Sequence, residues 1–548
     1  MSDFILHDSF DPAFRSPFGA VREGETLFLS VKIPVSCPAL AVFTVFERDD
    51  GFSLTLPMKK ARTENGYSDF SASLVLQERG LYFYYFRVDQ PDNSFRLFRA
   101  GLHSTNMEAG EKWQITCYPR DFRVPEKMRG GIMYQIFPDR FAISGEVKTE
   151  GKMRPFRVHG SVCEEPDGRP DGHGVWNTDF YGGNFGGITE KLDYIAGLGV
   201  NVIYLNPIFM ALSNHRYDTA DYMRPDPMLG TEAEFSRLCS EAEKRGISVI
   251  LDGVFSHTGS DSVYFNDVLE NPASPYRSWY RFERFPDLYD CWWDVKTLPC
   301  VNEDDPGYRD FIIENDDSVT AKWLGLGAGG FRLDVADELP DGFISSLRRR
   351  LKGLKKDALL IGEVWEDASN KVSYGKRREY FTAGELDGVM NYPFRNAVIG
   401  LVKNLISPSD FVETVLKIYE NYPFDALLCS TVFLSSHDTA RLRTELEGDI
   451  KKIEAAIALQ AFLPGIMCVY YGDENGMEGG NDPFNRGFFL FPDGGKEINR
   501  IYTRYLRIRK EKRVLQTGRL RVEADGSRLS VIRYDGDETE CLNLEFPT

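Results

Sequence analysis

The chain contains 548 residues, carries a formal net charge of −18, and is 42% hydrophobic. This length predicts two or three domains rather than one compact unit. The negative charge argues against binding to nucleic acid or to anionic membranes, since both require a basic surface. No stretch approaches the length of a membrane-spanning helix.

The N-terminal sequence and the cysteines indicate in which cellular compartment the protein is expected. The opening MSDFILHDSFDPAF has neither a basic nor an apolar region, so no signal peptide is predicted. The nine cysteines contain no CxxC pair, which favours reduced thiols over a disulfide framework or a zinc site. We therefore expect a cytoplasmic protein.

Residues 1–120 have the pattern of a β-sandwich domain. Residues 26–33 and 82–88 alternate between apolar and polar side chains, and turn-forming sequences at 48–51 and 90–93 follow such segments. Short alternating strands separated by turns are typical of two packed antiparallel sheets.

Residues 121–504 alternate between short apolar segments and amphipathic ones such as 232–245 and 450–462. Eight such repeats predict an α/β fold, a (β/α)8 TIM barrel. An insertion after the third strand is expected at about 257–305, and residues 505–548 predict a short C-terminal β domain. The eight expected barrel strands are 132–137, 202–205, 249–252, 331–334, 359–363, 389–391, 432–435 and 467–470.

One of these strands ends in Arg332 and Asp334. Residues two apart on a strand point to the same face, so the guanidinium would lie beside the carboxylate and favour its ionised form. An ionised carboxylate at the C-terminal end of a barrel strand suits a glycosidase nucleophile. Taken alone, such a pair is more often a structural salt bridge than a catalytic one.

Three other strands deliver acids or histidines at their C-terminal ends. Glu363 ends one, Asp438 follows another with His437, and Asp252 ends a third, with His257 close behind. Because burying unpartnered carboxylates is costly, several of them at strand ends indicate a shared polar site.

Motifs across residues 133–486 carry a family resemblance. The chain resembles the α-amylase family of glycoside hydrolases, within it the neopullulanase, cyclomaltodextrinase and maltogenic amylase group. The resemblance implies an N-terminal sandwich similar to a starch-binding module, a protruding B domain, and a longer C-terminal domain than this one. The matching segments, in the family's order, are MYQIFPDRF, GGNFGGITEKLDYIAGLGVNVIYLNPIF, NHRYDTADY, DGVFSH, GFRLDVADE, GEVW, DGVMNYPF, SSHDTARL and YYGDENGMEGGNDPFNR.

The resemblance implies that Asp334 is the nucleophile, Glu363 the general acid/base and Asp438 a stabiliser of the transition state. A retaining mechanism needs one ionised and one protonated carboxyl group. Glu363 lies between Ile361 and Trp365 in the sequence, and an apolar setting would raise its pKa as a proton donor requires. The residues implied to bind or support the sugar are Tyr217, Asp252, His257, Arg332, His437, Asp482 and Arg486.

The sequence departs from the family pattern at three places. Ser256 replaces a common Asn, which would loosen a supporting hydrogen bond or metal contact, and Asp337 stands in VADE where VANE is commoner. The loop after Phe141 lacks the Asn and Asp residues that bind calcium in several relatives. We therefore expect no calcium ion there, no other metal and no cofactor.

Several tryptophans could stack on sugars or simply pack in the core. Trp292 and Trp293 in the insertion are the better candidates, and the sequence alone leaves both interpretations open. The others are Trp176, Trp279 and Trp365.

The expected function is retaining hydrolysis of α-1,4-glucosidic bonds in cyclomaltodextrins, pullulan and maltooligosaccharides, with some transglycosylation. An α-1,6-cleaving enzyme, or a maltodextrin glucosidase, of the same family is the near alternative. A non-catalytic glycan-binding protein on the same fold is the distant one. The resemblance also leaves open a homodimer through the N-terminal domain, which light scattering would test.

Overall fold

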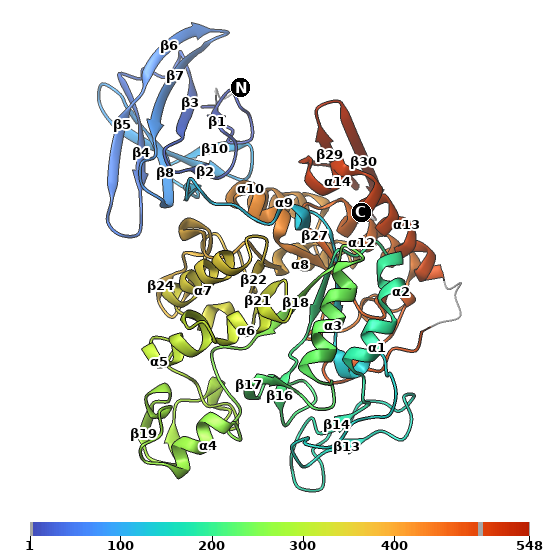
Figure 1. The fold of residues 1–548 in the computed structure, drawn as a ribbon. Helices are drawn as coiled ribbons and strands as arrows, with labels where there is room; N and C mark the ends of the chain where they lie inside the picture. The colour runs from blue at the N-terminus through green and yellow to red at the C-terminus, as the bar shows by residue number, and fades with distance from the viewer. Residues whose placement is uncertain (1–3, 492–496, 547–548) are drawn as a thin grey trace.

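The computed structural model describes residues 4–491 and 497–546 and has an N-terminal sandwich beside a barrel (Figure 1). One sheet of the sandwich has the order β1-β3-β7-β6, and the other has the order β10-β9-β8-β11-β2 with β4 and β5 branching from β8. Buried side chains of both sheets, including Val31, Tyr84 and Trp113, share one core. The predicted sandwich is confirmed. Its strands are β1 Arg15–Ser16, β2 Val21–Arg22, β3 Thr26–Pro34, β4 Ala41–Glu47, β5 Ser53–Pro57, β6 Lys59–Glu64, β7 Tyr67–Val75, β8 Gly80–Asp89, β9 Ser94–Ala100, β10 Ser104–Met107 and β11 Trp113–Tyr118.

Eight parallel strands close into a barrel in chain order, which confirms the predicted (β/α)8 fold. Every residue of these strands except Ser248 is buried, as expected of parallel strands covered by helices. The strands are β12 Ile132–Ile136, β15 Val202–Leu205, β18 Ser248–Gly253, β21 Gly330–Leu333, β22 Leu359–Val364, β25 Gly388–Asn391, β26 Thr431–Phe433 and β27 Ile466–Tyr470.

Helices follow the strands and begin at residues that satisfy free backbone N–H groups. Thr231 and Glu234 form a capping box at α3, and Ser407 and Asp410 form another at α9. The main helices are α1 Phe185–Glu190, α2 Leu192–Gly197, α3 Glu232–Glu243, α6 Val319–Gly325, α7 Asp341–Leu354, α8 Tyr392–Val402, α9 Pro408–Asn421, α10 Phe424–Cys429, α12 Ile450–Phe462 and α13 Glu497–Glu511. None of the described helices has the length and apolar character needed to span a bilayer.

Two long segments extend from the barrel on the side opposite the sandwich (Figure 1). The expected insertion after β18 carries α4 (Val263–Glu270), β19 (Phe282–Arg284) and β20 (Leu288–Tyr289). A second segment, between β12 and α1, carries β13 (Arg157–Val158) and β14 (Asp179–Phe180); it contains the loop after Phe141 and Trp176, but the sequence did not predict a second extension here.

The C-terminal part is a helical segment followed by a small sheet. Helix α13 continues through residue 505, where the C-terminal β domain was expected to begin, and α14 (Arg513–Thr517) follows it. The antiparallel sheet consists of β28 (Arg519–Asp525), β29 (Arg528–Asp535) and β30 (Glu538–Glu545), so a short β domain is present, and it begins after residue 518.

The buried carboxyl group of Glu385 lies near helix α7. Its Oε1 accepts a hydrogen bond from Ser345 Oγ at 2.9 Å, and its Oε2 has no hydrogen-bond partner among the described residues. Burial, reinforced by the nearby Asp341 carboxylate, raises the pKa of Glu385 from 4.5 to about 8. Between these values the folded protein holds a proton that the unfolded chain releases, so this group makes the free energy of unfolding fall as the pH rises.

Glu385→Gln should therefore flatten the pH dependence of stability. Glutamine carries no charge at any pH, so the variant should lose less stability than the parent between about pH 5 and about pH 9, by on the order of 1 kcal/mol or more. Thermal or urea unfolding across this range measures the difference. Glu243→Gln, at the exposed end of helix α3, serves as the control, and equal slopes for all three proteins would contradict the prediction.

Candidate active site

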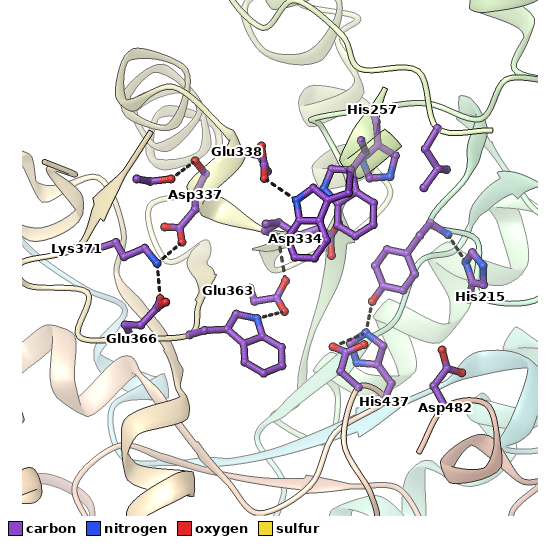
Figure 2. A pocket seen from close by; sticks show the side chains of 18 of the residues that line it. His215, His257, Asp334, Asp337, Glu338, Glu363, Glu366, Lys371, His437 and Asp482 are labelled. Carbon is purple, nitrogen blue, oxygen red and sulfur yellow. Dashed lines mark hydrogen bonds and ion pairs between the residues drawn. The ribbon is translucent and has the colours of Figure 1, made fainter. Parts of the chain in front are cut away.

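A pocket of about 770 Å³ opens at the C-terminal ends of the barrel strands, where the strand-end acids converge (Figure 2). Asp334 directly follows β21, Glu363 lies in β22, and Asp438 lies in the loop after β26. The sequence-predicted residues on the pocket wall are Tyr217, His257, Asp334, Glu363, His437, Asp438, Asp482 and Arg486. Asp252 and Arg332 are buried and do not line the pocket.

The Arg332 guanidinium joins three carboxylates beneath the pocket. Its Nη1 lies 2.8 Å from Asp252 Oδ1 and 2.8 Å from Asp334 Oδ1, and its Nη2 lies 2.8 Å from Glu363 Oε2. Although burial alone would lower it, Asp252 and Glu363 raise the pKa of Arg332 well above its usual value, so the cation persists. Three carboxyl groups therefore share a single positive charge.

This charge balance favours a proton within the cluster. Burial raises the pKa of Asp334 well above its usual value; the Arg332 cation opposes the rise, and the Glu363 carboxylate adds to it. Burial also raises the pKa of Asp252, and like charges around one cation cannot all ionise without cost. A cluster with both a retained proton and an ionised carboxylate has the two components that acetal cleavage requires.

Glu363 has polar surroundings, which differs from the apolar setting that its sequence neighbours predict. Its Oε2 accepts a hydrogen bond from Val335 N at 2.9 Å, and its Oε1 accepts one from Trp365 Nε1 at 3.0 Å. The indole thus contributes a donor rather than an apolar face, and the Val335 backbone comes from the loop after β21. Together with Arg332, these contacts hold the carboxyl group in one orientation.

A stacked Tyr217–His437 pair forms one wall of the pocket. The rings lie 5.5 Å apart at an interplanar angle of 10°, and the Tyr217 hydroxyl donates to Asp252 Oδ2 at 2.8 Å. Burial and the Arg332 and Arg486 cations lower the pKa of His437 well below its usual value, so it is neutral. Gln135 Nε2 lies 2.9 Å from His437 Nδ1, which places the imidazole proton on the Nε2 that faces Tyr217 and Asp438.

Asp438 and the two residues of the last loop complete this wall. Arg486 Nη1 lies 2.7 Å from Asp482 Oδ1, and its Nη2 lies 3.7 Å from Asp438 Oδ1. The enclosing protein and the Glu363 carboxylate raise the pKa of Asp438 to about 7, against the opposing effect of Arg486. Asp438 can therefore accept or donate a hydrogen bond near neutral pH.

His257 is a buried residue of the pocket wall. Its Nδ1 lies 3.0 Å from Ser256 Oγ, whereas its Nε2 has no partner among the described residues. Burial lowers the pKa of His257 to about 4, so the ring is neutral. Ser256 thus supplies a hydrogen bond to the histidine, where the sequence analysis expected its presence to loosen one.

About half of the residues that line the pocket could not be singled out from the sequence. His215 was quoted only within NHRYDTADY, and Asp337 was noted only as a departure. The other pocket residues that the sequence analysis did not single out are Asn177, Leu298, Val335, Glu338, Glu366, Lys371, Ser373 and Tyr374. They lie on loops and in elements of two or three residues that have no periodic pattern, so only the fold brings them together.

The tryptophans fall into two groups. Trp292, Trp293 and Trp365 line the pocket. Trp279 is packed in the core at 3% exposure, and Trp176 is 57% exposed without lining the pocket. Within residues 4–491 and 497–546, no group of three or more His, Cys, Asp or Glu side chains is placed to hold a metal ion.

A family model described as the α-amylase catalytic domain matches residues 135–513. The chain belongs to the α-amylase family. It is 34% identical to a cyclomaltodextrinase from Geobacillus thermopakistaniensis over 77% of this chain and 69% of that protein. It is 33% identical to an amylopullulanase from Thermoanaerobacter thermohydrosulfuricus over 94% of this chain and 40% of that protein.

The likeness extends to solved structures. A cyclomaltodextrinase structure aligns with a TM-score of 0.72 at 28% identity, covering 99% of this chain and 91% of the other. The α-amylase family chain described here spans less than half the length of the amylopullulanases that it matches.

Proposed function

We propose that this member of the α-amylase family is a retaining hydrolase of α-1,4-glucosidic bonds in cyclomaltodextrins, pullulan and short maltooligosaccharides. The observation that carries the proposal is the convergence of Asp334, Glu363 and Asp438 on one pocket, with two of them on the same guanidinium. The alignment with a cyclomaltodextrinase over nearly the whole chain supports this substrate class.

In the first step, an Asp334 oxygen forms a bond to the anomeric carbon while the bond to the leaving oxygen breaks. Glu363 gives its proton to that oxygen. In the second step, Glu363 takes a proton from water, the water oxygen bonds to the anomeric carbon, and Asp334 leaves as a carboxylate. A second sugar hydroxyl in place of water gives transglycosylation.

The wall of Tyr217, His257 and His437 is suited to the sugar that is attacked. The Tyr217 ring offers an apolar face to the C–H side of a pyranose. The two neutral imidazoles and Asp438 offer hydrogen bonds to its hydroxyl groups. Contacts that strengthen as the ring flattens toward the oxocarbenium-like state would accelerate the reaction.

A preference for α-1,6 bonds is the second candidate, because relatives named amylopullulanase match 94% of this chain. Product analysis on cyclodextrin, pullulan and starch side by side separates the candidates. Panose from pullulan supports α-1,4 cleavage, and maltotriose supports α-1,6 cleavage. Glucose as the first product indicates a glucosidase, and calorimetric binding without turnover indicates a glycan-binding protein.

A further inference from the structure

A short hairpin carries an exposed tyrosine at the edge of the pocket. Strands β23 (Val372–Ser373) and β24 (Lys376–Arg377) flank Tyr374, which lines the pocket although its side chain is 79% exposed. Its φ is +50°, a backbone conformation that costs a non-glycine residue energy. The hydroxyl lies 2.7 Å and 2.8 Å from the two carboxylate oxygens of Glu338, and this contact holds the ring at the edge of the pocket.

Trp293 of the insertion approaches the same carboxylate. It is 72% exposed, has a φ of +47°, and stacks on Trp292 with a centroid separation of 5.0 Å. Its Nε1 lies 3.4 Å from Glu338 Oε1. Glu338 therefore links exposed aromatic rings from two distant segments, and both rings offer apolar faces of the kind that sugars stack on.

Glu338, which accepts the Tyr374 hydroxyl, lies on the side of the pocket away from His437, whereas Trp293 stacks on Trp292, whose ring lies 5.7 Å from His257. Figure 2 shows Asp337, Glu338, Glu366 and Lys371 on one side of Asp334 and Glu363, and His215, His437 and Asp482 on the other. If the second group holds the sugar that is attacked, the first group faces the leaving-group side of the glucan.

The N-terminal sandwich contacts this hairpin directly. The turn between β4 and β5 supplies Asp49, whose Oδ2 accepts a hydrogen bond from Arg377 Nε at 2.7 Å. Arg377 also donates to the backbone oxygen of Asn370, and the Asn370 side chain donates to Gln114 Oε1 of β11 at 2.9 Å. Figure 1 shows the sandwich lying next to the part of the barrel that carries β24.

We propose that the N-terminal sandwich positions the β23–β24 hairpin, through Asp49 and Gln114, so that Tyr374 binds the leaving-group side of the glucan. This inference rests on the proposed function and adds a role for the sandwich within a single chain. Asp49 and Gln114 act as positioning residues, because neither lines the pocket.

Asp49→Asn removes the charge that holds Arg377 and should raise KM for maltooligosaccharides about two- to fivefold, the range of an exposed ion pair, with kcat little changed. The matched control is Asp69→Asn, which removes a similar pair to Arg62 Nε at 2.9 Å within the sandwich. Tyr374→Ala should raise KM about five- to tenfold. In the double variant, Asp49→Asn should add nothing to Tyr374→Ala, because both act through the same side chain.

Limited trypsin digestion gives a readout that needs no turnover. A hairpin released from the sandwich opens more often, so cleavage after Lys376 or Arg377 should be about threefold faster in Asp49→Asn than in Asp69→Asn. If the wild type is active and Asp49→Asn has the same KM as Asp69→Asn, the inference is overturned, whatever the digestion shows. If the wild type cleaves none of the glucans, the proposed function itself is overturned. The digestion then still reports whether the sandwich holds the β23–β24 hairpin in place.

Discussion

Asp334→Asn is expected to lower the hydrolysis of cyclomaltodextrins and maltooligosaccharides by at least about a thousandfold in kcat/KM. An amide oxygen cannot form the covalent glycosyl intermediate, so the first step loses its nucleophile. Arg332 keeps its contacts with Asp252 and Glu363 in the variant, so the rest of the cluster retains its partners. Initial rates of reducing-sugar release, measured on purified parent and variant, give the ratio.

Asp337→Asn is the matched control for this prediction. Asp337 also lines the pocket, but it pairs with Lys371 Nζ at 3.0 Å rather than with Arg332. The change restores the residue that is commoner in the resembled group, and hydrolysis should stay within about tenfold of the parent. A similar loss in both variants, or hydrolysis that survives Asp334→Asn, would contradict the assigned role.

The sequence was sufficient to predict the barrel and most of the first wall of the site. Parallel barrel strands all present their C-terminal ends at one edge, so acids that end separate strands must lie near each other. The two-residue period of a strand placed Arg332 and Asp334 on one face, and the structure gives them a 2.8 Å contact.

The surroundings of each carboxyl group could not be predicted in the same way. Glu363 accepts from Val335 N, whose backbone direction depends on a left-handed turn with a φ of +35° after β21. Trp365 could have presented either its ring face or its N–H, and the sequence does not distinguish them. The pairing of Asp49 with Arg377 joins residues 328 positions apart, with no pattern that relates them.

Glu420→Ala is expected to destabilise the contact between the sandwich and the barrel by roughly 3–5 kcal/mol. Glu420, at the end of helix α9, pairs with Arg15 Nη1 at 2.8 Å and with Arg99 Nη1 at 2.9 Å, and all three side chains are buried. Removing the carboxylate leaves two guanidiniums without a counter-charge away from water. Urea unfolding followed by tryptophan fluorescence should show an earlier transition, and Trp113 would report on the sandwich.

Glu413→Ala on the same helix separates the effect of the buried triad from a general effect on α9. Among the described residues Glu413 pairs with the partly exposed Lys417 at 3.0 Å, and Lys417 keeps a second partner in Glu111 at 3.2 Å, so the loss of Glu413 should cost less than about 1 kcal/mol. If the cost of Glu420→Ala comes from the unpaired guanidiniums, adding Arg15→Met and Arg99→Met should restore much of the stability, because an apolar interface then replaces the ionic one. A triple variant no more stable than Glu420→Ala would instead assign the loss to the packing of the arginine side chains.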